Sequence, residues 1–371
     1  MSWQEELKKC ITTADELCDK LGLSESDRKK YEEIISRFPM MITPYYFSLI
    51  DGNDPEDPIA RMCIPSESEL AQEGSFDTSG ENSNTKQEGV QHKYTQSALI
   101  LSTNACAMYC RHCFRKRLVG LSEKELNKQV DKAASYVRSH PEITNVLISG
   151  GDSLMNTNDV IRRYLEELCS IPHLDLIRIC SRIPVTLPQR IYDDEELLNI
   201  FKEYSDKKQL YLVTQFNHPR EITSESIAAV RAAQSCGMQV RNQTVLLRGV
   251  NDDPAVLGEL LRSLTRIGVV PYYIFQCRPV TGVKSRFQIP LREGVRIVDD
   301  AKSLQNGIGK SVRYCMSHPL GKIEILGEGE EGKMLFKFHE NKYPEYKSRI
   351  FIKKLDKDAT WLDEDLHLDE N

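Results

Sequence analysis

Alternating apolar and amphipathic segments are the feature that most constrains the fold of this chain. From residue 97 onward, short apolar runs are each followed by a stretch with helical periodicity. Six such units in succession predict a parallel sheet, because parallel strands need long crossover connections that are usually helices. The predicted strands are Ser97–Thr103, Asn145–Ser149, Leu176–Ser181, Tyr211–Gln215, Gln239–Leu246 and Tyr272–Gln276. The predicted helices are Lys124–Arg138, Asp159–Cys169, Glu196–Tyr204, Ser224–Cys236, Pro254–Ile267 and Glu293–Leu304.

Two architectures share this alternation, a parallel α/β barrel and a doubly wound nucleotide-binding sheet. The second is usually marked by G-x-G-x-x-G after its first strand, and no such motif follows Ser97–Thr103. A barrel places its active groups at the carboxyl ends of its strands. Polar residues recur at those predicted ends and favour the barrel: Gly150-Gly151-Asp152, Ser181-Arg182, Phe216-Asn217-His218-Pro219, Asn242-Gln243 and Gln276-Cys277-Arg278.

Three cysteines follow the first predicted strand in the spacing Cys106-x₃-Cys110-x₂-Cys113. Three thiolates can ligate three irons of a [4Fe–4S] cluster and leave the fourth iron open. A zinc site or three unrelated buried thiols are the alternatives, but structural zinc takes four protein ligands and His112 is cramped between two of the cysteines. The spacing resembles the signature of the radical SAM superfamily. That resemblance implies that the open iron binds S-adenosylmethionine (SAM), which the reduced cluster cleaves to an adenosyl radical.

Composition excludes several other classes of protein. The 371 residues and 40% apolar content allow one large α/β domain with appendages. A net charge of −6 does not suggest a nucleic-acid-binding protein, and no apolar stretch approaches the roughly 20 residues of a membrane span. The charged first residues lack the apolar region of a signal peptide, so eleven cysteines indicate a reducing cytoplasm rather than disulfides.

Changes in composition divide the chain into four regions. Residues 1–68 are predicted to be a helical region, and the polar residues 69–92 a linker or long loop. Residues 93–307 carry the alternating units. Residues 308–371 form a carboxyl-terminal region that contains Lys322, which follows Pro319 and Gly321. A glycine-flanked lysine on a loop can form a Schiff base with pyridoxal phosphate (PLP), although residue type alone favours an ordinary exposed lysine.

The chain as a whole resembles the lysine 2,3-aminomutase family. The segments that carry the resemblance are the cysteine loop, Ile42–Asp51, Ser181–Arg190, Phe216–Pro219, Asn242–Asp252 and Pro271–Cys277. Membership implies a partial (β/α)₆ barrel of the TIM type with a carboxyl-terminal extension that carries the PLP lysine. It also implies an isomerase that uses a [4Fe–4S] cluster, SAM and PLP to move an amino group from carbon 2 to carbon 3.

Site residues carry over from the family one by one. Cys106, Cys110 and Cys113 match the cluster ligands, Lys322 the catalytic PLP lysine, and Arg115 the arginine for the substrate α-carboxylate. Lys93 and Tyr94 match two groups that bind the PLP phosphate, whereas Ser97 stands where the family often has a further arginine. The family's carboxyl-terminal zinc cysteines are absent, so no zinc is expected. The residues expected to bind SAM are His112, Gly150, Gly151, Asp152, His218 and Gln243; for His218 a buried structural role is equally open.

The substrate is where the chain departs from the family. Lysine-specific members use two aspartates for the side-chain ammonium, and this chain has Arg278 at the first position and Ser317 and His318 nearest the second. An arginine facing an ammonium in a dry pocket is unfavourable. We therefore expect a glutamate- or aspartate-type substrate, unless Arg278 turns outward or pairs with an acid.

Two alternative activities remain open, a lysine 2,3-aminomutase and a radical SAM enzyme of another reaction type that has lost PLP. The expected partners are a free amino acid, an electron donor such as flavodoxin or ferredoxin, and further copies of the chain in a homo-oligomer.

Overall fold

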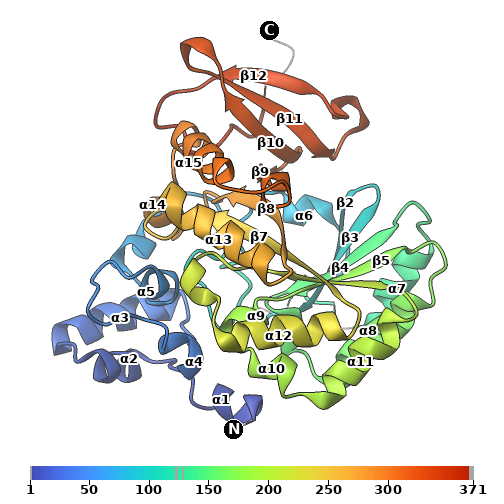
Figure 1. Cartoon of the computed structure of the whole chain (residues 1–371), viewed down its shortest axis with the longest axis horizontal. Helices are drawn as coiled ribbons and strands as arrows, with labels where there is room; N and C mark the ends of the chain where they lie inside the picture. Colours follow the sequence, from blue (N-terminus) through green and yellow to red (C-terminus); the bar gives the residue numbers. More distant parts are fainter. Residues whose placement is uncertain (1, 122–123, 128, 367–371) are drawn as a thin grey trace.

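One mixed sheet organises the computed structural model, which describes residues 2–121, 124–127 and 129–366 (Figure 1). Its strands are ordered β1 to β12 as in the chain. Strands β3 to β9 are parallel to their neighbours, and the two flanks are antiparallel. The strands are β1 (Thr85–Gln87), β2 (Val90–Tyr94), β3 (Ser97–Thr103), β4 (Asn145–Gly150), β5 (Leu176–Cys180), β6 (Gln209–Thr214), β7 (Gln239–Leu246), β8 (Val270–Gln276), β9 (Arg313–His318), β10 (Gly321–Glu328), β11 (Lys333–Asn341) and β12 (Ile350–Lys354).

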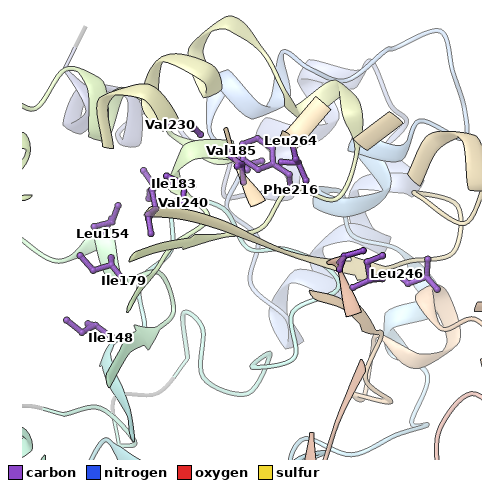
Figure 2. Close-up of a cluster of buried hydrophobic side chains, with 14 of the residues drawn as sticks. Ile148, Leu154, Ile179, Ile183, Val185, Phe216, Val230, Val240, Leu246 and Leu264 are labelled. Atoms are coloured by element: carbon purple, nitrogen blue, oxygen red, sulfur yellow. The ribbon is translucent and has the colours of Figure 1, made fainter. Parts of the chain in front are cut away.

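Six helices connect the parallel strands and pack against the outer face of the sheet (Figure 1). They are α7 (Val130–Arg138), α8 (Asn158–Cys169), α11 (Glu195–Ser205), α12 (Ser224–Ser235), α13 (Pro254–Arg266) and α15 (Leu291–Ser303). Strand residues alternate between the two faces, so Ile148 and its register partner Ile179 join the apolar layer beneath the helices (Figure 2). Leu147 and Arg178, one residue earlier in each strand, face the interior cavity. The predicted α/β partial barrel is confirmed.

The first connecting helix is shorter than predicted. It begins at Val130 rather than Lys124, and residue 128 lies outside the described residues. Asn127 explains the difference, because its backbone N–H donates to the Leu101 carbonyl at 2.7 Å and its side chain to the Glu88 carbonyl at 3.3 Å. Pairing with the sheet therefore overrides the helical pattern of this segment.

The parallel part of the sheet is one strand longer than predicted. Strand β9 lies parallel to β8, and a tight connection at Pro319-Leu320 leads into β10. Among the described strands, β3 and β9 do not pair with each other, so the barrel stays open. Lys93 of β2 reaches across this opening to the His318 carbonyl of β9. Lys322 thereby lies beside the interior of the barrel.

Residues 69–92 are more ordered than the predicted linker or long loop. They include a helical turn α6 (Glu81–Asn84), β1 and part of β2. Glu69 and Glu81 are buried although they are charged, because arginines from the cysteine loop pair with them. As domain limits, the four predicted regions stay a prediction.

Short helices occupy the amino-terminal region: α1 (Trp3–Leu7), α2 (Ala14–Leu21), α3 (Glu25–Arg37), α4 (Pro44–Phe47) and α5 (Pro58–Cys63). Ile11 interrupts the helices by pairing with Ile42 in a single antiparallel bridge. Shorter helical turns in the described chain include α9 (Ile183–Thr186), α10 (Gln189–Tyr192) and α14 (Lys284–Phe287). Within the described part of the chain, no helix has the length and apolar character of a membrane span.

Candidate active site

A cavity of about 350 Å³ lies inside the open barrel and brings most of the predicted site residues together. Its size is in the range of small-molecule sites. One side is formed by the loop after β3 and the carboxyl ends of the parallel strands, and the other by β2, β9, β10 and β11. The predicted residues that line it are Cys106, Cys110, Cys113, His112, Gly150, Gly151, Asp152, Gln243, Lys93, Tyr94, Lys322, Arg115 and Arg278. His218 is the predicted site residue that does not line it.

The three cysteines lie on the loop after β3 with their thiols free of disulfides. Burial and the neighbouring acidic groups raise the pKa of Cys106 well above its usual value, and burial raises the pKa of Cys113 to about 11. Metal binding at this loop must therefore displace protons from the thiols. Among the described residues no three possible ligands converge as tightly as around a single ion. A [4Fe–4S] cluster does not require that convergence, since each cysteine ligates a different iron.

The amino-terminal region holds the cysteine loop in place. The backbone N–H groups of Tyr109 and Arg111 donate to the carbonyls of Met41 and Met62, each at 2.9 Å. The Arg111 side chain also pairs with buried Glu69, which accepts from Lys116 at 2.6 Å. Burial alone would raise the pKa of Glu69, but Arg111 and Lys116 outweigh burial and lower it.

Arg182, at the end of β5, makes a polar contact with the loop that the sequence did not assign. Its guanidinium donates to the Cys110 sulfur at 2.8 Å and to Glu221 at 2.6 Å. Tyr46 of α4 donates its hydroxyl to the same carboxylate at 2.6 Å. Arg182 thus links a predicted cluster ligand to a buried network at the strand ends.

The Gly150-Gly151 pair is required by close packing against the cysteine loop. A Cβ atom on Gly151 would lie 2.4 Å from the Ala105 carbonyl oxygen, and Gly150 has a φ of +127°. The Asp152 carboxylate accepts from Ser181 Oγ at 2.6 Å and from the Arg182 N–H at 2.7 Å. The turn therefore lines the cavity while its acid is already hydrogen bonded to protein groups.

The two predicted histidines differ in their positions. His112 lines the cavity, and its Nε2 accepts from the Asn217 amide at 3.2 Å, which places the ring proton on Nδ1. That Nδ1 is buried without a partner among the described residues, and burial keeps the pKa of His112 well below its usual value. His218 instead accepts from the Arg220 backbone N–H at 3.2 Å, which is the structural alternative left open above.

Lys322 is buried at the opposite side of the cavity. Its ammonium pairs with Glu340 of β11, its register partner across the β10–β11 ladder. The same ammonium lies 4.4 Å from the centre of the Tyr273 ring and 5.8 Å from that of Tyr94. Lys93 lies nearby on β2, and burial together with Arg278 lowers its pKa to about 7.

A third group of charges joins the two sides of the cavity. Arg115 pairs with Glu81 at 3.0 Å, and Glu81 also pairs with Arg117 at 2.7 Å. Arg278 donates to Ser79 Oγ at 2.8 Å and lies 4.1 Å from the centre of the Phe114 ring. Arg278 thus points into the cavity rather than outward.

Sequence reasoning missed several side chains that line the cavity. Glu81 and Gln91 lie in the stretch predicted as a linker, and Glu340 lies on β11. Of these missed residues, Arg178 had a signal in the sequence: it is a charged residue inside an otherwise apolar predicted strand. The register that brings these four side chains to one cavity is not contained in any local pattern.

Similarity to known proteins agrees with this arrangement. Residues 100–260 match the radical SAM superfamily. An Aquifex aeolicus protein whose name places it among the L-lysine 2,3-aminomutases is 40% identical over 92% of this chain and 91% of its own. L-lysine 2,3-aminomutase from Clostridium subterminale is 38% identical over 88% of this chain and 76% of its own. Glutamate 2,3-aminomutase from Clostridioides difficile is 37% identical over 86% and 74%.

The fold, the cysteine loop and the superfamily match define a radical SAM enzyme. The chain belongs to the lysine 2,3-aminomutase family, whose members are isomerases. Membership implies a [4Fe–4S] cluster and SAM. The donor set fits both, because three thiols without disulfides line one cavity, and His112 Nδ1, which has no hydrogen-bond partner within the described part of the chain, belongs to the same lining.

Proposed function

We propose that this enzyme is a PLP-dependent 2,3-aminomutase whose substrate carries a side-chain carboxylate, as glutamate and aspartate do. The family includes relatives named for lysine and a relative named for glutamate, so membership leaves the substrate open. The observation that carries the proposal is the position of Arg278. Within the described residues its guanidinium forms no ion pair and contacts Ser79 and the Phe114 ring. Glu81 is the strongest acidic influence on the pKa of Arg278, but its carboxylate is paired with Arg115 and Arg117.

The balance of charge around the cavity supports an anionic side chain. Among the described residues, six basic side chains and three carboxylates line the cavity: Lys93, Arg115, Arg178, Arg182, Arg278 and Lys322 against Glu81, Asp152 and Glu340. Each carboxylate already accepts hydrogen bonds from the protein. The lowered pKa of Lys93 reflects burial and this excess of positive charge. The ammonium of a lysine substrate would meet the same field without a free acid to receive it.

Several groups at the Lys322 side of the cavity fit PLP. Lys322 lies beside two aromatic rings, and Lys93, Gln91 and Arg178 line the same cavity. Gln91 Nε2 and Arg178 Nε are buried donors without a hydrogen-bond partner in the described part of the chain. When bound, PLP supplies an electron sink for the migrating amino group, and the cluster with SAM supplies the radical. Glu340 orients the Lys322 amine toward the cavity, and Arg115 with Arg278 offers two cationic positions for two substrate carboxylates. The Glu81 carboxylate already accepts from the Arg115 guanidinium. Arg115 can therefore bind a substrate carboxylate only while it also remains paired with Glu81.

The substrate test is anaerobic incubation of the reconstituted enzyme with glutamate, aspartate and lysine, followed by mass spectrometry of β-amino products. We expect turnover of an acidic amino acid and a loss of at least about tenfold in kcat/KM after Arg278→Gln, since a charged hydrogen bond is worth about 1.5–3 kcal/mol. Arg163→Gln, on the outer surface of α8, is the matched control. Efficient lysine turnover, or unchanged glutamate turnover in Arg278→Gln, contradicts the proposed substrate.

PLP dependence has a separate test. Lys322→Ala should remove the absorbance band of covalently held PLP while reductive cleavage of SAM continues. Borohydride reduction followed by peptide mapping identifies the lysine that holds PLP. Label on another lysine would reject Lys322, and the absence of any PLP band in the wild-type enzyme would favour a radical SAM reaction that has lost this cofactor.

A further inference from the structure

We infer that Arg178 and Gln91 anchor the phosphate group of the cofactor, in place of the arginine that Ser97 replaces. This inference rests on the proposed PLP dependence. It concerns a phosphate monoester as ligand and two residues that family resemblance did not assign.

Strand register places the two residues at one level of the barrel. Gln91 of β2 is the register partner of Leu99 on β3, which pairs with Leu147 on β4, which pairs with Arg178 on β5. All four side chains line the cavity. Gln91 and Arg178 are the polar ends of this row, and the two leucines between them form its apolar floor. The long side chains can therefore approach one ligand from two sides while the floor excludes water.

Both polar residues carry a buried donor without a protein partner. Gln91 Nε2 and Arg178 Nε are inaccessible to solvent, and within the described residues neither has a hydrogen-bond acceptor. Buried N–H groups are nearly always hydrogen bonded in folded proteins, so two in one cavity indicate a missing acceptor. A phosphate monoester has three strong acceptor oxygens, and a guanidinium suits it especially well.

Ser97, at the position where the family often has a further arginine, is linked to Arg178 through Asn145. The Ser97 Oγ accepts from the side-chain Nδ2 of Asn145 at 2.9 Å, and the side-chain Oδ1 of Asn145 accepts from the Arg178 guanidinium. The small serine leaves space at the start of β3 and orients the side chain of Asn145. Asn145 in turn accepts from a terminal nitrogen of the Arg178 guanidinium and leaves Arg178 Nε for another acceptor.

The position of Arg178 relative to Lys322 agrees with one bound cofactor. Arg178 is among the charges that lower the pKa of Glu340, and Glu340 pairs with the Lys322 ammonium. Lys93, whose ammonium donates to the carbonyls of Ser79 and His318, adds a further basic group to the same wall. A ligand covalently held at Lys322 can consequently direct an anionic group toward Arg178.

The test compares PLP with pyridoxal, which lacks the phosphate but keeps the aldehyde that reacts with Lys322. Binding of each to cluster-loaded, PLP-free enzyme is titrated by absorbance for the wild type, Arg178→Gln, Arg178→Lys, Gln91→Leu and the surface control Arg163→Gln. We expect Arg178→Gln to weaken PLP binding by about 10- to 100-fold and pyridoxal binding by less than about threefold. Arg178→Lys should recover part of the loss, and Gln91→Leu should cause a smaller loss that is again specific to PLP.

Each outcome separates this inference from the function on which it rests. A wild-type enzyme that binds neither compound covalently removes the PLP proposal. A wild type that prefers PLP, with the same preference in Arg178→Gln and Gln91→Leu, overturns the inference alone. Arg178→Gln with an unchanged PLP preference but a raised KM for the amino acid also overturns it, since Arg178 would then bind substrate. If Arg178→Gln does not fold, Arg178→Lys and Gln91→Leu decide the question.

Discussion

The two sides of the cavity are built in different ways. The cysteine side comes from one short loop, Cys106–Cys113, which is fixed by Glu69 and by backbone hydrogen bonds to the amino-terminal region. The lysine side is assembled from single residues on separate strands, among them Gln91, Arg178, Lys322 and Glu340. A contiguous loop carries its chemistry in its spacing, whereas dispersed residues acquire theirs only through strand register.

Replacement of a cysteine should have the largest effect of the substitutions predicted here, and it should affect the cysteine side of the cavity but not the lysine side. Cys106→Ala, Cys110→Ala or Cys113→Ala should each abolish 5′-deoxyadenosine formation from SAM, because an iron loses its protein ligand. Binding of PLP at the distant lysine should persist in all three variants. SAM cleavage at the wild-type rate in any one of them would remove that cysteine from the ligand set.

Loss of the Glu69 carboxylate should have the next largest effect, and it tests whether the cysteine loop depends on its anchor. Glu69→Gln leaves the charges of Arg111 and Lys116 buried without their partner, so unfolding should become about 3–5 kcal/mol more favourable. Urea denaturation measures this change. The control is Glu67→Gln, whose exposed pair with Lys30 at 3.2 Å should be worth about 1 kcal/mol or less. Equal effects of the two substitutions would argue against an anchoring role.

Replacement of Lys93 should have the smallest effect, a change in how the free energy of unfolding depends on pH. This change reports on the positive charge at the lysine side of the cavity. Burial and Arg278 hold the pKa of Lys93 at about 7, below the value of about 10.4 in an unfolded chain. Between these values the unfolded state binds more protons, so the contribution of Lys93 to stability rises with pH. In PLP-free protein, the free energy of unfolding of the wild type should gain about 2 kcal/mol relative to Lys93→Met from pH 7 to pH 9. Parallel pH profiles for the two proteins would contradict the lowered pKa.

The same contrast explains how far the sequence could predict the molecule. The parallel strands were predictable because each is a short apolar run followed by a helical pattern, and β3 and β7 have the predicted bounds. The cysteine loop was predictable from spacing. The segment around Glu81 was read as a linker, because its pairing with Arg115 and Arg117 joins residues far apart in the sequence. Strand β9 was missed as a barrel strand for a similar reason, since only its partner β8 defines its role.

The late position of β9 and β10 in the chain also bears on how the enzyme matures. During synthesis the strands from β2 to β8 emerge before β9 and β10, because the chain is made from its amino terminus. The cysteine loop and its anchors are complete in this earlier part of the chain, whereas Lys322 joins the cavity only when the last strands dock. A ligand held by Lys322 therefore binds only the finished sheet and stabilises it by mass action. Occupancy of that lysine thus reports whether the carboxyl-terminal strands have assembled.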